Sequence, residues 1–390
     1  MPEPSQPIYD LVLAGGTVLD PASDTNAELD VAVSSGRVAA IGEGLRAQAR
    51  TPDAVIDCRG KTVVPGLIEG HTHIFESVSK VGAPAREAHL RRGVVAAADA
   101  GTAGASTFAA FRRLVVDQNP MRIVNFLNVS VLGLIDFRFG ELLNPDTLVP
   151  QDALAVAAEN PDVVRGFKIR MSEDVVGHNG EKLLQRAVEV AEQARLPLMV
   201  HIGETEAPLP QVLDQLRPGD IVAHCYTGKP HGILDDNAVQ PAVHAARTRG
   251  VLFDSAHGKS NFSYRVAKPA IAAGFYPDIV SSDTSARNWR GPVFDLLTTI
   301  SKLVALGMPF EECIRRATVV PANLLGLAGE GYGALRVGGP AHITVLDLTD
   351  EVELPDAAGN SLSAPRYEPV LAFNHGQRVD LTPWRGETSA

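Results

Sequence analysis

The middle of the chain alternates between short apolar segments and helical patterns, and this alternation restricts the possible folds more than any other feature. The apolar segments are Val63–Glu69, Val94–Asp99, Arg122–Val129, Val163–Ile169, Leu196–His201, Asp220–His224, Val251–Asp254 and Asp278–Ser282. Runs of this length are typical of buried strands. Repeated strand–helix units predict a parallel sheet, and eight of them predict a closed (β/α)₈ TIM barrel of α/β class.

Helical patterns lie between several of these segments. Glu181–Leu196 has apolar residues at helical spacing, and the segments ending at Gly250 and Gly274 have plausible helix stops. Pro269 inside the last of them indicates a kink or a late start. A doubly wound open sheet is the competing fold, but no GxGxxG follows the first strand, so its nucleotide-binding motif is missing.

Both ends of the chain have a different residue pattern from the middle. "YDLVLAGGTVLD" and "ELDVAVSSGRVAAIG" near the start, and "GALRVGGPAHITVLDL" and "EPVLAFNHGQRV" near the end, are apolar runs divided by Gly, Asp and Ser turns. Such runs are typical of strands with tight connections. We therefore predict a small β-sandwich domain from residues 1–62 plus 333–390, and a barrel from residues 63–332.

Composition limits the functional class. The 390 residues are 45% hydrophobic, which fits a soluble protein with a large hydrophobic core. The formal charge of −11 argues against a nucleic-acid-binding protein. No apolar run suits a membrane span. The three cysteines are too few and too widely spaced for a disulfide framework, and "MPEPSQPIYD" lacks the regions of a signal peptide. We expect a cytoplasmic enzyme that acts on a small molecule, and a homo-oligomer.

Residues able to bind metal stand at five of the eight predicted strand ends. They are His71 and His73 after the first strand, Lys168 after the fourth, His201 after the fifth, His224 after the sixth and Asp283 after the eighth. In such barrels the active site lies at the carboxyl ends of the strands. An isolated HxH is weak evidence for a metal site, but six such residues at one end of the barrel predict one.

The residue types indicate which metals are expected. Four imidazoles and a carboxylate suit two divalent ions, with Zn²⁺ as the expected metal. Lys168 is the exception, because an ammonium group repels cations. A buried lysine loses its proton readily, and the free amine can take up CO₂ to give an N6-carboxylated side chain. Its two oxygens could bridge ions roughly 3.5–4 Å apart, the spacing of two-metal hydrolytic sites.

The complete set resembles the amidohydrolase superfamily over nearly the whole chain. Segments such as "DAGTAGASTF", "HCYTGKPHGIL" and "ATVVPANLLGL" are most similar to its bacterial amidohydrolase/deacetylase group, which is dihydroorotase-like. The resemblance implies that His71, His73 and Asp283 hold one metal and that His201 and His224 hold the second. It also implies that carboxylated Lys168 and a hydroxide bridge the two ions, and that the hydroxide attacks the carbonyl. Asp283 would then carry the proton to the leaving group.

The resemblance leaves several functions open. We expect a two-metal hydrolase of a small amide or ester, of the N-acyl amino acid or acyl hydroxy acid type. The first alternative is a cyclic amidase of the dihydroorotase or hydantoinase kind. Dihydroorotase-type members have an arginine at the position of Phe75, which speaks against that substrate. Further alternatives are a catalytically silent scaffold and an isomerase or decarboxylase on the same barrel.

Substrate contacts are predicted with less support. The candidates are Arg170, Tyr226, Lys229, His257 and Asn128, all at or just after predicted strand ends. Arg170 could clamp a carboxylate or pair with Glu173. Cys225 adjoins His224 but should face the opposite side of its strand as a small buried hydrophobe.

Overall fold

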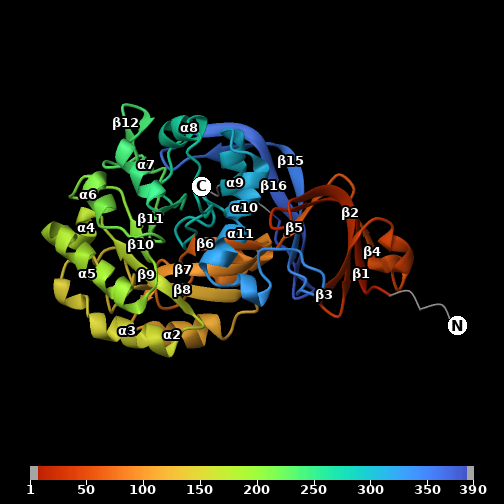
Figure 1. Cartoon of the computed structure of the whole chain (residues 1–390), viewed down its shortest axis with the longest axis horizontal. Helices are drawn as coiled ribbons and strands as arrows, with labels where there is room; N and C mark the ends of the chain where they lie inside the picture. Colours follow the sequence, from red (N-terminus) through yellow and green to blue (C-terminus); the bar gives the residue numbers. More distant parts are fainter. Residues whose placement is uncertain (1–7, 384–390) are drawn as a thin grey trace.

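The computed structural model describes residues 8–383, whose strands form two main sheets (Figure 1). The predictions that concern residues 1–7 and 384–390, namely the missing signal peptide and the outer limits of the β domain, lie outside these residues. Among the helices of residues 8–383, none is long and apolar enough to cross a membrane.

The larger sheet is built from both ends of the chain, as predicted. Its order is β17-β16-β15-β5-β1-β2-β3, and β4 pairs with β1. The bounds are β1 (Leu11–Asp20), β2 (Thr25–Ser34), β3 (Arg37–Gly42), β4 (Val55–Asp57), β5 (Thr62–Pro65), β15 (Ile343–Pro355), β16 (Ser361–Asn374) and β17 (Gln377–Arg378). Strands β1 to β4 lie to one side of the barrel (Figure 1). The domain limits at 62/63 and 332/333 stay predictions.

The second sheet is parallel, and its strands follow one another in sequence order. They are β6 (Leu67–Thr72), β7 (Val94–Gly104), β8 (Arg122–Asn128), β9 (Val164–Arg170), β10 (Leu198–His201), β11 (Ile221–Ala223) and β14 (Leu252–Asp254). They correspond to the first seven predicted segments, except that Val63–Pro65 of the first segment belongs to β5 of the larger sheet. Between β11 and β14, the short hairpin of β12 (Leu234–Asp235) and β13 (Ala238–Val239) lies outside this sheet.

The eighth predicted strand, Asp278–Ser282, does not form a regular ladder. It closes the barrel through two isolated parallel bridges, Asp254 to Ile279 and Thr72 to Thr284. Backbone N–H groups reinforce this seam, since Asp283 donates to the His71 carbonyl at 2.8 Å. Asp283 itself has φ +50°, so the extended conformation breaks at the residue that should end the strand.

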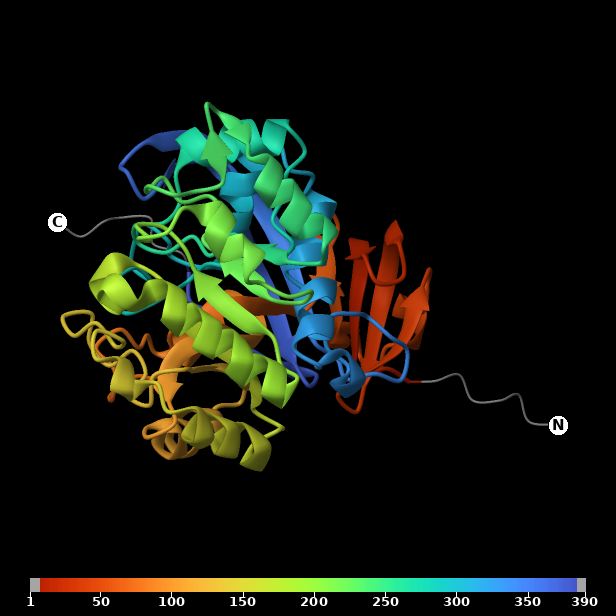
Figure 2. The ribbon, with the colours of Figure 1, turned by 60° about the vertical axis from the view of Figure 1, so that its left-hand side comes forward.

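Helices cover the outside of the barrel (Figure 2). They are α1 (Ala85–Ala88), α2 (Phe108–Phe111), α3 (Pro150–Glu159), α4 (Glu173–Val176), α5 (Gly180–Ala194), α6 (Leu209–Asp214), α7 (Pro241–Thr248), α8 (Tyr264–Ala272), α9 (Leu296–Ala305), α10 (Phe310–Arg316) and α11 (Val319–Leu324). The predicted helices correspond to α5, α7 and α8. Helix α8 starts at Tyr264 and contains Pro269, so the late start is wrong.

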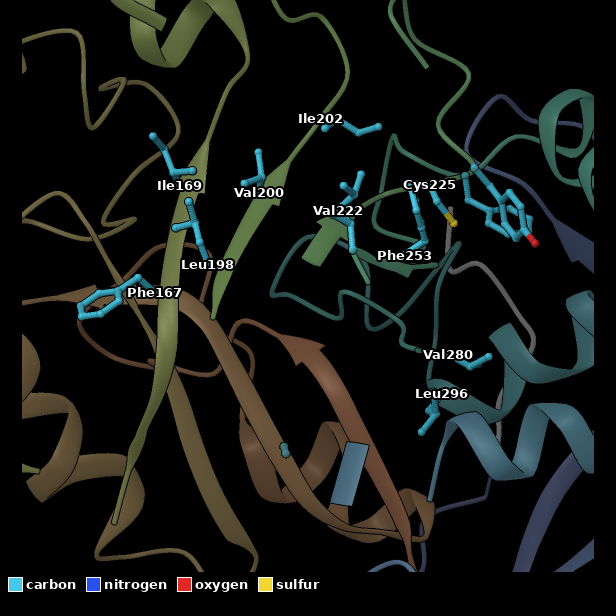
Figure 3. Packing of buried hydrophobic residues seen from close by; sticks show 14 of the residues in the cluster. Phe167, Ile169, Leu198, Val200, Ile202, Val222, Cys225, Phe253, Val280 and Leu296 are labelled. Carbon is cyan, nitrogen blue, oxygen red and sulfur yellow. The ribbon is translucent and has the colours of Figure 1, made fainter. Parts of the chain in front are cut away.

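Alternation along the barrel strands separates a helix-facing side from the barrel interior. Phe167, Ile169, Leu198 and Val200 belong to the core between the strands and the helices (Figure 3). The residues between them therefore point inward. A second apolar cluster, which includes Ile68, Phe126, Met199, Ile221 and Ile279, fills the interior below the strand ends. The carboxyl ends of the strands therefore lie above a closely packed apolar interior.

Candidate metal centre

The six predicted metal-binding side chains converge at the carboxyl ends of the barrel strands, and all are buried. The ring centroids of His201 and His224 are 4.2 Å apart, and those of His71 and His224 are 5.3 Å apart. His71, His224 and Asp283 each offer one ligand atom within 4.8 Å of the others. Strand alternation explains this direction for Lys168 and His201, whereas His224 and Asp283 follow their strands at φ +69° and +50°, where the extended backbone breaks.

Groups outside the cluster fix the orientation of three imidazoles. Nδ1 of His71 is 2.9 Å from Asp254 Oδ2, and Nδ1 of His73 is 2.8 Å from Thr102 Oγ1. Nδ1 of His224 donates to the Ala256 carbonyl at 2.7 Å. These bonds leave Nε2 of each ring for the centre, which is the usual arrangement of metal-binding histidines.

Lys168 reaches the same point from β9. Its Nζ lies 3.3 Å from His71 Nε2, and it has no ion pair with Asp283 or Glu69 within residues 8–383. Gly101 provides the space for this side chain, because a Cβ there would lie 2.6 Å from Lys168 Cγ. Its φ of +88° also favours glycine.

Asp283 faces the histidines from the closing segment. Its Oδ1 is 3.2 Å from His73 Nε2 and 3.7 Å from His71 Nε2. Gly258 packs against the other oxygen, since a Cβ there would approach Oδ2 to 2.4 Å. The backbone N–H of Gly258 donates to the Ser282 carbonyl at 2.9 Å, so the turn after β14 supports Asp283 from behind.

Burial disfavours the protonated forms of three of the imidazoles and of Lys168. It lowers the pKa of His71 and His201 well below the usual value and the pKa of His224 to about 4. Burial also lowers the pKa of Lys168 to about 8. Burial opposes the charge on Asp283, yet the imidazoles of His73, His71 and His224 hold its pKa below the usual range. Neutral nitrogens beside an ionised carboxylate suit cation binding.

Two buried atoms support a metal at this position. Nε2 of His201 and Oδ1 of Asp283 are buried and make no hydrogen bond within residues 8–383, although Oδ1 lies 3.2 Å from His73 Nε2. Such orphaned polar atoms are costly, and a bound cation would satisfy both lone pairs. The donor set of four imidazoles, a carboxylate and a lysine therefore fits divalent metal ions.

The cluster forms the floor of a cavity of about 190 Å³. The loops after the strands supply the walls, including Leu134 and Phe137 after β8 and Ser172 after β9. Arg170 and Lys229 also line the cavity, as predicted. Arg170 is buried and pairs at 3.1 Å with Glu141, so Glu173 is the wrong partner.

Three predicted substrate contacts do not reach the cavity. Asn128 donates to the Gly101 carbonyl, the Tyr226 hydroxyl donates to the Phe275 carbonyl, and His257 Nε2 accepts from Lys302 Nζ. All three are buried, and none lines the cavity. Their polar atoms are bonded within the barrel, and their role as substrate contacts stays a prediction. Cys225 is a buried free thiol on the helix-facing side, as expected.

Several lining residues escaped the sequence analysis because they stand in loops. Lys259 and Asn261 follow β14, and Ser285, Arg287 and Asn288 follow Asp283. No periodicity marks them, and their only signal was closeness to a strand end. Asp254 was also missed, although it ends the seventh predicted segment.

The amidohydrolase family sequence pattern matches residues 62–382. The chain belongs to the amidohydrolase family. A deacetylase of Agrobacterium fabrum is 34% identical over 345 residues, which cover 86% of this chain and 84% of that protein. A deacetylase of Enterococcus faecalis is 30% identical over 378 residues, covering 95% and 99%.

Solved structures agree with this assignment. A crystal structure described as a dihydroorotase superposes with a TM-score of 0.88 at 31% identity, over 97% of this amidohydrolase and all of that chain. The predicted fold class, a TIM barrel with a β-rich appendage, is confirmed. The predicted enzyme class is also confirmed: this amidohydrolase is a metal-dependent hydrolase of amide or ester bonds.

Proposed function

We propose that this amidohydrolase removes the acyl group from an N-acyl amino acid or an acyl hydroxy acid. The observation that carries the proposal is the position of Arg170, which lines the same cavity as the candidate metal ligands and belongs to the same strand as Lys168. A guanidinium at that point suits a substrate carboxylate close to the scissile bond. The related deacetylases support an acetyl group as the acyl part.

Within this proposal, His71, His73 and Asp283 would hold one Zn²⁺, and His201 and His224 would hold the second. N6-carboxylated Lys168 would supply a further anionic ligand. Bound ions of this kind lower the pKa of a coordinated water and polarise a carbonyl. The pKa of about 8 for Lys168 supports carboxylation, because CO₂ reacts with the neutral amine.

The protein's own groups have distinct roles in this reaction. Asp283 is the proposed catalytic base, and its carboxylate takes the proton of the attacking water. The same carboxyl group then donates the proton to the leaving nitrogen or oxygen. Arg170 and Lys229 hold the substrate's carboxylate, and the cavity walls exclude bulk water.

Metal content tests the centre directly. Wild-type protein purified without chelator should carry about two divalent ions per chain by elemental analysis, the stoichiometry of a two-metal site. Lys168→Ala should carry one or none, and Lys182→Ala, on the exposed face of α5, should match the wild type. Absence of metal even after addition of zinc with bicarbonate would contradict the proposal and favour a silent scaffold.

A panel of substrates then distinguishes a deacylase from a cyclic amidase. N-acetyl amino acids and acetyl hydroxy acids should be cleaved, whereas dihydroorotate and hydantoins should not. The structure supports this difference, because Phe75 is fully buried against Phe111, with ring centroids 5.2 Å apart. Turnover of only the cyclic substrates would replace the proposal with a cyclic amidase.

We further propose that the enzyme works in the cytoplasm as a homo-oligomer. The free, buried thiols of Cys58, Cys225 and Cys313 support a reducing compartment. Homo-oligomers are the usual state of soluble assemblies. Light scattering on the purified chain measures the mass directly.

A further inference from the structure

The rim of the cavity carries two cations that no carboxylate neutralises. Lys259 and Arg287 are exposed, line the cavity and have no ion pair with any residue in the range 8–383. The other two cations of the wall differ, since Arg170 pairs with Glu141 at 3.1 Å and Lys229 with Glu204 at 2.9 Å. The inner cations therefore each contact one carboxylate of the protein, whereas the outer two have no such partner within residues 8–383.

Arg287 is held close to Arg170 by one aromatic ring. The guanidinium carbon of Arg170 lies 5.0 Å from the ring centroid of Phe137, and that of Arg287 lies 4.9 Å from the same centroid. Cation–π contacts of this kind orient a guanidinium while its N–H donors stay free. Two like charges on one ring repel each other, and an anion bound beside them reduces that repulsion.

The remaining lining charges do not cancel this excess. Three carboxylates line the cavity, namely those of Asp174, Glu204 and Asp283. Glu204 pairs with Lys229, whereas Asp174 has no ion pair in the described part of the chain. Asp283 belongs to the candidate metal centre. One acid thus faces two open cations at the rim, and guanidinium N–H groups match a carboxylate in a bidentate way.

We propose that Arg287 and Lys259 select substrates with a second anionic group, so that the preferred substrates are acyl derivatives of dicarboxylic amino or hydroxy acids. This inference rests on the proposed hydrolase function and extends it. Arg170 takes the carboxylate next to the scissile bond. The two rim cations take a carboxylate at the far end of the substrate.

Calorimetric titration of the full chain, as purified, tests this selection without catalysis. The probes are succinate, glutarate and adipate, each compared with its monomethyl ester, which lacks one charge. The best dicarboxylate should bind the wild type about tenfold more tightly than its ester, the ratio expected for one charge-assisted contact. Arg287→Met and Lys259→Met should each reduce that ratio to about threefold or less.

Arg290→Met is the matched control, because Arg290 stands in the same loop but contacts Trp289 and does not line the cavity. It should keep the wild-type ratio. Equal affinity of the wild type for acid and ester, or no binding of either, would overturn the proposal. An unchanged ratio in both Met variants would also overturn it, since the second carboxylate would then bind the metal. Failure of hydrolysis with a retained binding ratio would reject only the proposed function.

Discussion

Single side chains beside the candidate metal ligands determine how the site is arranged. Asp254 orients His71, Thr102 orients His73, and the Ala256 carbonyl orients His224. Removal of such partners typically costs ten- to a hundredfold in metal affinity or activity. The imidazoles are therefore held in a binding orientation by the protein itself.

His89 gives a residue-scale prediction about pH. Its Nε2 donates to Thr72 Oγ1 at 2.8 Å, and its buried Nδ1 has no hydrogen-bond partner among residues 8–383. Burial lowers its pKa from 6.5 to about 4. Between these values the unfolded chain binds more protons than the folded one, so stability falls as the pH falls. From pH 7 to pH 5, the wild type should lose about 2 kcal/mol more than His89→Gln.

Urea unfolding at both pH values measures this difference. Other titrating groups are common to the two proteins, so their contributions cancel in the comparison. His178→Gln is the control, because His178 is exposed and should leave the wild-type pH dependence intact. Parallel pH profiles for wild type and His89→Gln would show that His89 does not resist protonation.

Sequence analysis found residues in strands or close to their ends and missed most of those that lie further along the loops. His201 and Lys168 were predictable because strand alternation determines their direction. Arg287 and Lys259 were not, since loop conformation has no period. Asn128 and Tyr226 stand at strand ends as expected, but backbone carbonyls accept their donors and they do not line the cavity, which the sequence could not indicate.

At the scale of elements, the closing segment Asp278–Ser282 is the least regular part of the barrel. Its prediction as a strand rested on apolar residues, and the structure forms only isolated bridges there. Side chains compensate for the missing ladder. Glu69 of β6 accepts hydrogen bonds from the backbone N–H groups of His71 at 3.1 Å and Ser282 at 3.0 Å, and also from the Ser282 hydroxyl.

Glu69→Ala should therefore open this seam. Two buried backbone N–H groups would lose their acceptor, and each unsatisfied group costs about 1–3 kcal/mol. We expect a loss of roughly 3 kcal/mol in the free energy of unfolding, measured by urea denaturation. Glu189→Ala, on the exposed face of α5, should stay within about 0.5 kcal/mol of the wild type. An equally small effect of Glu69→Ala would mean that the backbone bridges suffice.

At the scale of the whole molecule, the β15–β16 hairpin connects the larger sheet to the helices of the barrel. Phe373 of β16 lies in the core of the large sheet. Further back along the same strand, Tyr367 stacks on Phe310 of α10, with ring centroids 4.1 Å apart. Arg366 is fully buried and pairs with Asp295, the residue that caps α9, at 2.6 Å. One hairpin thus belongs to both parts of the protein (Figure 2).

Because of this connection, we expect the protein to unfold as one unit. Arg366→Met leaves the buried Asp295 carboxylate without its arginine, which should destabilise the fold by about 3–5 kcal/mol. Scanning calorimetry should show a single transition at a lower Tm. Arg378→Met, in exposed β17, should leave the Tm nearly unchanged. Two separate transitions in the variant would instead indicate that barrel and β-rich part melt independently.

The residues of the candidate metal centre and those of the cavity wall stand on two different kinds of backbone. The candidate metal ligands and Arg170 stand at or within a few residues of strand ends, whereas Phe137, Lys259 and Arg287 stand in connecting loops. Loops tolerate substitution and insertion better than barrel strands do. Substitutions in these loops can therefore change the preferred substrate without altering the candidate metal ligands. Libraries confined to residues 134–141, 259–261 and 285–290 should yield enzymes of new specificity that keep the parental metal content.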